Sequence, residues 1–589
     1  MKFSKQSTSI HRILLLLCFV HFSGLEVKGL DYDYSFTREC LEDPLKPQYG
    51  GGIVVNPEFS QGIKGWTSFG GAAIEKRESH LGNNFIVALN RSHGRDSFSQ
   101  KFILKKNTFY TISAWLRISH EEANVAAVFK TSGDVHHYAG WSIARSGCWS
   151  MFKGGLAANY SGSAELYFEC DHPSTEIWAD GVSLQPFTQE EWASHRNQSV
   201  EKVRKSKVKI RAIDHTTGNP MVNATVEIKA VTTNFPLGNA VSNRILTIPA
   251  YQDWFAKRFR YAVFENEMKW QWNEPQPGQE DYHFADRMFQ FVQKNNIKTR
   301  GHNVVWENDF WLPNWAKNMD ANQLKNATIR RQLSIMRRYR GQVIHWDVVN
   351  ENLHFSYFED KFQSNRASYV FYKRAQVIDG EAVMFLNDFD TIEKPSGFKA
   401  SPAKYLEKID LIRSQGYDGP LGIGIQGHFY DPPVGPYIRS ALDALATAEL
   451  PIWISELDVN VSWPKAAEYL EEALRELQAH PAVEGIMIWA PWSPPDCYRM
   501  CITDADFKNL PTGDVVDKLL DEWSHAGGFV GSTDKDGYFH SSLFHGDYEL
   551  RINHPSVANS SKKSYKFKVE SSRKVKHVVL KISPEISSN

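Results

Sequence analysis

The most constraining feature of this sequence is the alternation, between about residues 208 and 525, of short apolar runs with amphipathic segments. The apolar runs are rich in Val, Ile, Phe and Trp, which favours strands, and the segments between them carry apolar residues at helical spacing. Eight strands alternating with helices predict an α/β protein containing a (β/α)8 TIM barrel, whose active site forms at the carboxyl ends of the strands. The predicted strands are Pro236–Val241, Tyr261–Glu267, Lys298–His302, Val343–Asn350, Ala382–Asn387, Gly422–Gln426, Ile452–Glu456 and Gly485–Trp489. The predicted helices include Ile248–Phe259, Phe284–Lys294, Gln323–Tyr339, Arg366–Ile378, Pro402–Ser414 and Ala466–Ala479.

The N-terminal half of the sequence follows a different pattern. A chain of 589 residues is too long for one core, and domain-size statistics predict about three or four domains. Residues 47–188 contain short alternating runs, such as Phe109–Leu116, Ala164–Phe168 and Glu176–Leu184, separated by Gly, Asn and Ser. This pattern predicts a β-sandwich module. The charged segment 189–207 is interpreted as a connecting helix or linker, and the catalytic barrel is expected to span residues 236–525.

Two further segments flank the predicted barrel. Residues 208–235 show a strand, a turn between Asp214 and Gly218, and a second strand, and residues 526–589 contain Thr533-Asp534-Lys535-Asp536-Gly537. Each segment resembles half of a transthyretin-like β-sandwich. We therefore expect the barrel to be inserted into a small split β-domain, although two unrelated barrel extensions remain an alternative.

The N-terminus has the composition of a secretory signal peptide. Lys2, Lys5 and Arg12 precede the apolar run Ile13–Val20, and small residues follow before position 30, so residues 1–29 are expected to be removed. No later run reaches the roughly 18 apolar residues that a membrane span needs, so no membrane segment is expected in the mature form. The sequence thus predicts a secreted protein, located outside the cell or in the cell wall. Seven glycosylation sequons agree with that route: Asn90, Asn159, Asn197, Asn223, Asn326, Asn460 and Asn559.

Charge and cysteine content restrict the possible partners. The net charge of −1 does not indicate a nucleic-acid partner. No His or Cys cluster has metal-ligand spacing and no Gly-rich loop follows a strand, so neither a metal nor a cofactor is predicted. Cys497 and Cys501 are close enough in sequence to form a disulfide, and we expect one. At least one of the other three cysteines is expected to stay free or to pair elsewhere, and the sequence does not indicate which. These are Cys40, Cys148 and Cys170.

Two apolar runs of strand character lead into the glutamates Glu351 and Glu456, which lie 105 residues apart. A carboxylate at the end of a buried strand is costly to desolvate and is seldom retained for packing alone. Two carboxyl groups in one cleft are the minimum that hydrolysis of a glycosidic bond requires. The alternative is that both glutamates merely cap the helices that follow.

The sequences around these glutamates, WDVVNE ending at Glu351 and ISELDV around Glu456, resemble glycoside hydrolase family 10, the endo-1,4-β-xylanases. A third motif, Glu265-Asn266-Glu267-Met268-Lys269-Trp270, matches the family's ENxMKW. The resemblance implies that Glu351 is the acid/base and Glu456 the nucleophile of a retaining enzyme. It also implies an orienting role for Asp458 towards His428. The implied substrate-binding residues are Glu265, Asn266, Lys269, His302, Trp306, Asn350, Gln426, His428 and Trp489.

The chain departs from the family pattern at several positions. Trp306 is followed by Glu307-Asn308-Asp309 where the family often has His-Ser-Gln, and the fifth strand ends in Leu386-Asn387-Asp388-Phe389-Asp390. Cys497 occupies the position of a tryptophan found in many members, within an insertion similar to that of plant members. We expect these changes to affect subsite affinity, and the balance of hydrolysis against transfer, without altering the glutamate pair.

The N-terminal segment resembles the family 22 carbohydrate-binding modules through Asn56-Pro57-Glu58-Phe59, Gly65-Trp66 and Leu166-Tyr167-Phe168-Glu169. The resemblance implies that Tyr167 and Glu169 bind xylan, with Tyr138 as a stacking partner. Arg95 stands where an aromatic residue is common, so weak binding is expected. A purely structural sandwich is the alternative.

Taken together, these features predict a secreted, retaining endo-1,4-β-xylanase that cleaves internal bonds of xylan, or of a related plant cell-wall polysaccharide, during wall degradation or remodelling. Within the same chemistry, the alternatives are transglycosylation between xylan chains and action on another β-1,4-glucan. From a different class, the alternative is a catalytically silent, wall-binding lectin that retained the barrel.

Overall fold

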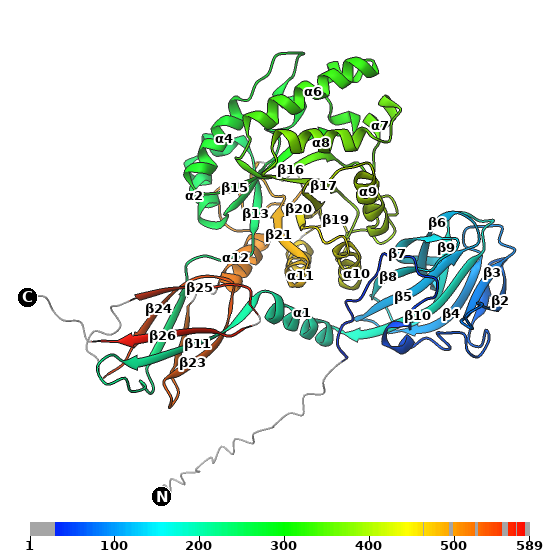
Figure 1. Ribbon diagram of the computed structural model, residues 1–589, viewed down its shortest axis with the longest axis horizontal. Helices are drawn as coiled ribbons and strands as arrows, with labels where there is room; N and C mark the ends of the chain where they lie inside the picture. The colour runs from blue at the N-terminus through cyan, green and yellow to red at the C-terminus, as the bar shows by residue number, and fades with distance from the viewer. Residues whose placement is uncertain are drawn as a thin grey trace, which may run out of the picture. The chain divides into compact units, whose positions relative to one another are not determined.

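The computed structural model describes residues 30–462, 464–493, 499–524, 528–555, 564–572 and 574–583. Within them a closed barrel of parallel strands confirms the predicted (β/α)8 architecture, since the last strand pairs with the first. Its helices surround the strands (Figure 1). The strands are β13 (Leu237–Val241), β14 (Tyr261–Phe264), β15 (Lys298–Trp306), β16 (Val343–Asn350), β17 (Val383–Asp388), β18 (Leu421–Ile425), β20 (Ile452–Val459) and β21 (Val483–Ile488). The short strand β19 (His428–Phe429) pairs with the far end of β20.

The helices of the barrel begin where local sequence favours a helix start. Asp320 forms a reciprocal capping box with Gln323, and Ser401 caps the helix that opens on Pro402. Both arrangements satisfy amide groups that the first turn leaves without partners. The helices are α2 (Pro249–Arg258), α3 (Trp270–Asn273), α4 (His283–Lys294), α5 (Asn314–Lys317), α6 (Ala321–Arg338), α7 (Tyr357–Phe362), α8 (Ala367–Ile378), α9 (Pro402–Ser414), α10 (Gly435–Ala446), α11 (Lys465–Ala479) and α12 (Pro511–Ser524).

The N-terminal module is a β-sandwich of two five-stranded antiparallel sheets. Apolar residues from the facing sides of both sheets, such as Phe98, Leu116 and Phe168, form its core. One sheet has the order β1 (Thr67–Phe69), β4 (Ser97–Leu104), β9 (Gly162–Cys170), β6 (Glu122–Thr131), β7 (Val135–Arg145). The other has the order β2 (Ala73–Glu78), β3 (Asn84–Leu89), β10 (Ile177–Thr188), β5 (Thr108–Ile118), β8 (Ser150–Ala158).

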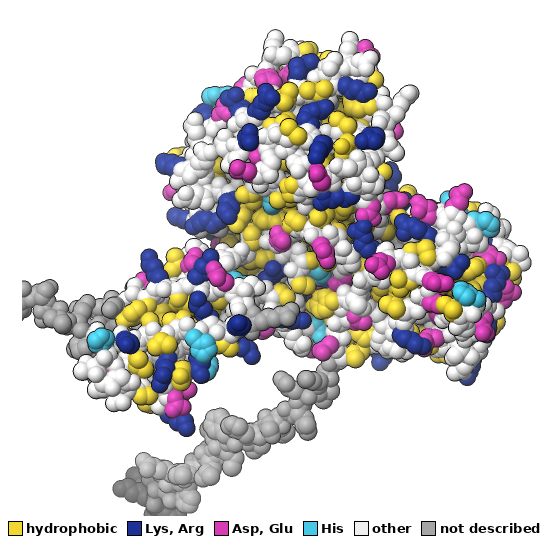
Figure 2. Space-filling model, viewed as in Figure 1, with side chains coloured by type: hydrophobic (Ala, Val, Ile, Leu, Met, Phe, Trp, Pro, Cys, Tyr) yellow, Lys and Arg dark blue, Asp and Glu magenta, His cyan; other side chains and the backbone are white. Residues whose placement is uncertain are grey.

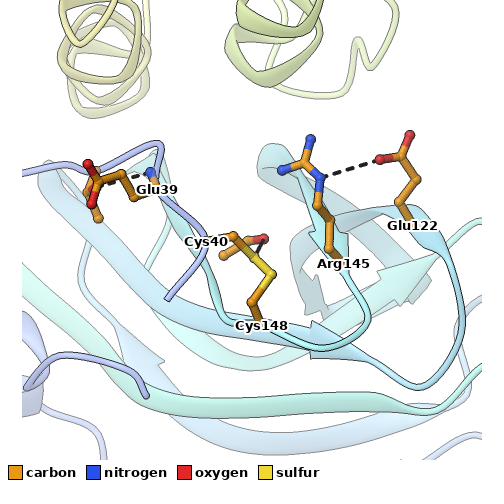
Figure 3. The surroundings of a disulfide bond; sticks show 7 residues. Glu39, Cys40, Glu122, Arg145 and Cys148 are labelled. Atoms are coloured by element: carbon orange, nitrogen blue, oxygen red, sulfur yellow. Dashed lines mark hydrogen bonds and ion pairs between the residues drawn. A yellow bond between two sulfur atoms is a disulfide. The ribbon is translucent and has the colours of Figure 1, made fainter. Parts of the chain in front are cut away.

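The structure assigns the cysteines that the sequence left open. Cys40 and Cys148 form a disulfide that joins the segment before the module to the turn between β7 and β8 (Figure 3). Cys170 is free and buried. Cys501 is disulfide-bonded. Cys497 lies outside the described residues, so its expected bridge to Cys501 stays a prediction.

The segment interpreted as a connecting helix or linker forms helix α1 (Gln189–Val203), and strand β11 (Lys205–Asp214) already begins before residue 207. A capping box between Thr188 and Glu191 starts the helix. The helix packs on α11 through Trp192, whose indole N–H donates to Glu476 at 3.0 Å, and Ser199, whose hydroxyl donates to the Ala479 carbonyl at 2.6 Å. The segment is therefore packed against the barrel rather than a free tether.

Strand β11 also joins the segments before and after the barrel into one small β-domain. It pairs antiparallel with β23 (Tyr538–Phe544) and parallel with β26 (Lys576–Ile582). A second sheet contains β12 (Thr225–Ala230), β22 (Phe529–Ser532), β24 (Gly546–Asn553) and β25 (Ser564–Val569). Side chains from both flanks of the barrel, among them Ile210, Val226 and Leu550, share one core. The split β-domain predicted from the two flanking segments is thus present, and the alternative of unrelated extensions is wrong.

Helix α10 was not predicted, and every residue from Gly435 to Leu445 is buried, including the polar Arg439, Ser440 and Asp443. It packs on the barrel through α9 and α11 and on the module through β8. Ser440 donates to the Gly154 carbonyl at 3.1 Å, and a Cβ atom on Gly155 would lie only 2.4 Å from Pro436 Cβ. Such close contact requires glycine on the module side.

A buried ion pair crosses the same interface. Lys153 Nζ of β8 lies 2.6 Å from Asp443 Oδ2 of α10, and both side chains are almost fully buried. His480 Nε2 lies 3.1 Å from the other oxygen of Asp443. Breaking such a pair leaves an uncompensated buried charge, which costs far more than the loss of an exposed pair.

We predict that Lys153→Met lowers the free energy of unfolding by about 3–5 kcal/mol, the range typical of a broken buried pair. Lys153→Met combined with Asp443→Asn should recover most of this loss, because the amide keeps its contact with His480 and no buried charge remains. The matched control is Lys373→Met, which breaks the exposed pair with Asp418 and should cost less than about 1 kcal/mol. Urea titrations of the full chain measure all three, and equal losses for Lys153→Met and Lys373→Met would contradict the prediction.

No described helix is both long enough and apolar enough to cross a membrane. On the face of the molecule drawn in Figure 2, basic and acidic side chains are interspersed. This mixture agrees with the net charge of −1.

Candidate active site

A cleft of about 820 Å³ opens at the carboxyl ends of the barrel strands. One side of it is formed by the segments after β14 and β15, and the opposite side by the segments after β17 and β18. Nine of the residues expected from the sequence line the cleft: Glu265, Asn266, Lys269, Trp306, Glu351, Gln426, His428, Glu456 and Trp489. The other three, His302, Asn350 and Asp458, are buried behind it.

Glu351 follows β16 directly and has a left-handed backbone conformation, with φ of 59°. Its carboxyl group accepts a hydrogen bond from Gln426 Nε2 at 3.3 Å. Burial and the nearby negative charge of Asp388 raise the pKa of Glu351 to about 7, while Trp306 and Gln426 act in the opposite direction. The negative charge of Glu456 raises it further. Glu351 is therefore largely protonated in mildly acidic solution.

Glu456 lies on β20 and has the opposite electrostatic environment. Asn387 Nδ2 donates to its Oε1 at 2.8 Å. His302 Nδ1 lies 3.9 Å from Oε1, and His428 Nε2 lies 3.6 Å from Oε2. Burial alone would raise the pKa of Glu456, but His302, His428 and Asn387 together lower it to about 2. Glu456 is thus ionised over the whole range in which Glu351 changes its protonation state.

Each of the two histidines is held by a buried carboxylate. His302 Nδ1 lies 2.9 Å from Asp347 Oδ2, and Arg300 Nη2 donates to Asp347 Oδ1 at 2.6 Å. All three side chains are almost completely buried.

On the other side of Glu456, His428 Nδ1 lies 2.9 Å from Asp458 Oδ2, and Arg499 Nη2 donates to Asp458 Oδ1 at 3.1 Å. Burial acts to lower the pKa of His428, but Asp458 and Glu456 raise it to about 10. This geometry places Asp458 where the sequence predicts an orienting residue for His428.

Two of the buried nitrogens beside the glutamates, Asn350 Nδ2 and His302 Nε2, have no hydrogen-bond partner among the described residues. Asn350 is held through its oxygen, which accepts from Asn387 Nδ2 at 2.9 Å. A buried donor without a partner is costly, so such groups are usually satisfied by a ligand or by water. Both nitrogen atoms are available to hydroxyl groups of a bound sugar.

The wall of the cleft nearest β14 and β15 combines a buried cation with aromatic rings. Lys269 Nζ donates to Asn266 Oδ1 at 3.0 Å and lies 5.2 Å from the Trp306 ring centroid and 5.7 Å from that of Trp489. Burial lowers the pKa of Lys269. Trp306 stacks on Trp311 with a centroid distance of 5.1 Å. Such a wall offers apolar faces and a few polar groups, as sugar sites do.

Several functional neighbours were not predicted. Asn387, which contacts both Asn350 and Glu456, ends a predicted strand in a polar pair, and that position was a usable signal. Glu393 accepts from the backbone amides of Gly427 and His428, each at 2.9 Å, and thereby holds the turn that carries His428. Nothing local in the sequence distinguishes Glu393, Arg499 or Trp311 from surface residues.

Glu307, noted as a departure from the family pattern, has a structural position. It is buried, accepts from the Phe358 amide at 2.8 Å and from Asn352 Nδ2 at 3.2 Å, and so holds the start of α7. Burial raises its pKa to about 8.

The structure brings Tyr138, Tyr167 and Glu169 together on one sheet of the N-terminal module. The hydroxyl groups of Tyr138 and Tyr167 each lie 3.2 Å from Glu169 Oε2, and Arg95 Nε lies 3.5 Å from the same oxygen. The ring of Tyr167 is fully buried and stacks on Phe69 at 4.1 Å. Tyr138, in contrast, is partly exposed.

The described residues contain no group of three or more His, Cys, Asp or Glu side chains arranged to hold a metal ion. The cleft does contain two buried carboxyl groups whose pKa values are shifted in opposite directions. One protonated and one ionised carboxyl group in a single cleft are the arrangement of a glycosidase site.

Comparison with known proteins agrees with this class. Residues 228–494 match glycosyl hydrolase family 10, and residues 51–174 match a carbohydrate binding domain. The protein named endo-1,4-beta-xylanase 5-like of Arabidopsis thaliana is 36% identical over 564 residues, which are 93% of this chain and 94% of that protein. Endo-1,4-beta-xylanase 4 of the same plant is 32% identical over 593 residues, 96% of this chain and 97% of that protein. Among solved structures, xylanase 10B from Thermotoga petrophila RKU-1 with xylobiose matches 49% of this chain and 94% of its own, at 22% identity and a TM-score of 0.43. The chain belongs to glycosyl hydrolase family 10.

The pKa of Glu351 predicts how activity depends on pH. On a natural glycoside, whose leaving oxygen needs a proton, kcat/KM should fall as pH rises through about 7, because Glu351 loses its proton there. On a dinitrophenyl glycoside, whose leaving group needs no proton, this alkaline decline should disappear. Steady-state kinetics with both substrates in the same buffers test the prediction, and an alkaline decline at the same pH for both would contradict it.

The alkaline decline should also respond to the charge of Asp388. Asp388→Asn removes a negative charge that raises the pKa of Glu351, so the decline should move to lower pH. The amide oxygen still accepts from Leu353 N, which Asp388 binds at 2.7 Å. Asp390→Asn, in the same loop but paired with Lys394 at 3.2 Å, is the matched control and should cause a smaller shift. An unchanged profile for Asp388→Asn would show that this charge does not set the pKa of Glu351.

Proposed function

We propose that this protein is a secreted endo-1,4-β-xylanase that hydrolyses internal bonds of xylan with retention of anomeric configuration. The observation that carries the proposal is the contrast between the surroundings of two carboxyl groups in one cleft: His302, His428 and Asn387 lie around Glu456. Glu351, in contrast, is buried near the negative charge of Asp388, and its pKa is raised to about 7 while that of Glu456 is lowered to about 2. Environments that drive paired carboxyl groups apart in this way assign one as the acid and the other as the nucleophile. The names of the Arabidopsis relatives support xylan as the substrate.

The first chemical step uses both carboxyl groups. Glu351 gives its proton to the leaving glycosidic oxygen while Glu456 attacks the anomeric carbon, which forms a covalent glycosyl–enzyme and releases the leaving chain. The imidazoles of His302 and His428 keep Glu456 ionised and ready for attack. Asn350 is placed to donate to the 2-hydroxyl of the reacting sugar, a contact that strengthens in the transition state.

The second step reverses the role of Glu351. Once Glu456 is esterified its negative charge is gone, and with it one of the causes that raise the pKa of Glu351. Glu351, which has given its proton to the leaving oxygen, is therefore a carboxylate and serves as the base that takes a proton from the attacking water. Water breaks the ester bond, and Glu456 leaves as a carboxylate.

Substrate positioning falls to the residues of the β14 and β15 wall. Glu265, Asn266 and Lys269 are proposed to bind hydroxyl groups of the sugar on the non-reducing side of the cleaved bond. Trp306 and Trp489 supply flat faces for stacking, and Gln426 contacts the acid. The opposite wall, after β17 and β18, is then left for the reducing side of the chain.

Secretion and a role in the plant cell wall are part of the proposal. The six sequon asparagines within the described residues are all exposed, as acceptors of glycan must be. They are Asn90, Asn159, Asn197, Asn223, Asn326 and Asn460. The lectin alternative is not favoured, because a barrel that only binds sugar has no need to hold one glutamate protonated and the other ionised.

The proposal predicts release of reducing sugar from xylan by the purified protein, with little release from glucan or mannan. Glu456→Ala should lose nearly all of this activity, and azide should restore turnover of an activated aryl xylobioside by replacing the missing nucleophile. Glu351→Ala should retain most of its first step on the same activated substrate, because that leaving group needs no proton.

Analysis of the first products distinguishes the stereochemistry. NMR of the reaction with an aryl xylobioside should show the β-anomer before mutarotation. An α-product, or wild-type rates on xylan for both glutamate variants, would overturn the assignment.

A further inference from the structure

The wall of the cleft formed after β17 continues onto the N-terminal module. The loop between β17 and α9 lines the cleft through Asp390, Glu393, Lys394 and Ser396. The carbonyl of Ser396 also accepts a hydrogen bond, at 3.1 Å, from Trp141 Nε1 of module strand β7. One loop therefore forms both the rim of the cleft and the contact with the module.

A row of aromatic rings begins at this contact. The Phe398 ring is 46% exposed, and its centroid lies 6.0 Å from that of Trp141. Tyr138 stacks on Trp141 with a centroid distance of 5.6 Å and an interplanar angle of 18°. Trp141 and Tyr138 are both partly exposed. Rings at this degree of exposure offer free faces to a ligand.

The row exists because β7 is irregular. Residues three apart on a regular strand point to opposite faces, so Tyr138 and Trp141 would normally be separated. Here the pairing with β6 shifts between Tyr138 and Gly140, which inserts one extra residue and returns Trp141 to the face that carries Tyr138. Gly140 has φ of 141°, and a Cβ there would lie 3.2 Å from the Tyr437 ring of α10. The bulge thus places the aromatic row and accommodates the barrel helix at the same time.

Polar groups follow the last ring. The Tyr138 hydroxyl donates to Glu169 at 3.2 Å, and Arg95 lies beside the same carboxylate. A row of rings that ends in hydrogen-bonding side chains is what a polysaccharide needs, since sugars stack through their C–H faces and bind through their hydroxyls. The interface holding the row in place is the buried one around Lys153 and Asp443, which favours a fixed position of the module against the barrel.

We propose that Phe398, Trp141 and Tyr138 form an extension of the cleft that binds the reducing-side continuation of the same xylan chain. This inference rests on the proposed function, because it takes the substrate and its direction from there. The module is then a set of distal subsites in line with the active site and not a separate anchor. Its contribution should appear only for chains long enough to leave the cleft.

The test compares long and short substrates on the full-length protein. Phe398→Ala should raise KM for xylan and long xylo-oligosaccharides about five-fold, the size expected from one lost ring contact. It should leave kcat/KM unchanged for an aryl xylobioside, which occupies only the cleft. Tyr138→Ala should show the same pattern, with its effect beginning at a longer chain length than that of Phe398→Ala. The matched control is Phe284→Ala on α4, since Phe284 is 48% exposed and lies away from the cleft. This variant should keep the wild-type KM and kcat/KM on both substrates.

Each other result has a distinct meaning. Tyr138→Ala could weaken binding of the protein to insoluble xylan while KM for soluble oligosaccharides keeps its wild-type dependence on chain length. In that case the module binds a separate chain, and the proposal is overturned. Equal losses on the aryl xylobioside and on xylan would also overturn it. Because Phe398 lies on an exposed loop, its variant keeps the test valid even if Tyr138→Ala fails to fold. A wild-type protein inactive on both substrates would instead refute the proposed function.

Discussion

The geometry of the site depends on the interactions of the buried Asp347 carboxylate with its two neighbours. This carboxylate is completely buried in the centre of the barrel, where an isolated charge would be very costly, and it is compensated by Arg300 on one oxygen and His302 on the other. All three side chains come from the adjacent strands β15 and β16. The strand register of the barrel is thereby coupled to the position of His302, and through His302 to the charge of Glu456.

The same arrangement, a buried carboxylate that contacts an arginine and a histidine, occurs on the other side of Glu456. Asp458 is paired with Arg499 and contacts His428, so that Glu456 has an imidazole beside each of its oxygens. Glu351, in contrast, lies beside the neutral side chains of Gln426 and Trp306 and faces the negative charge of Asp388. The two glutamates have the same chemistry and equal burial, so the difference in their pKa values arises from these neighbours.

The barrel was predictable from the sequence because each of its strands is an apolar run and most of its helices carry a polar face. Helix α10 was missed. It is covered on both sides, so its few polar residues, Arg439, Ser440 and Asp443, make buried contacts and do not form an exposed face. In the site, residues at strand ends were found because strand ends in a barrel converge. Glu393 and Arg499 were missed because their effect on His428 arises only when separate loops fold together. Tyr167 was expected to bind xylan, and the burial of its ring was likewise not foreseeable, because the ring of Phe69 on β1 covers it.

The covered helix α10 also determines what the module contributes to the enzyme. A binding module on a flexible linker raises only the local concentration of substrate, because its position relative to the cleft is averaged over many orientations. Here the helix α1 between module and barrel is packed on α11, and β8 is packed on α10 through a buried ion pair. Freedom of the tether is therefore lost on folding, at a cost in conformational entropy that the buried contacts offset. If the module carries the proposed subsites, a module held in this way adds binding energy along the direction of the bound chain, on the same substrate molecule that lies in the cleft.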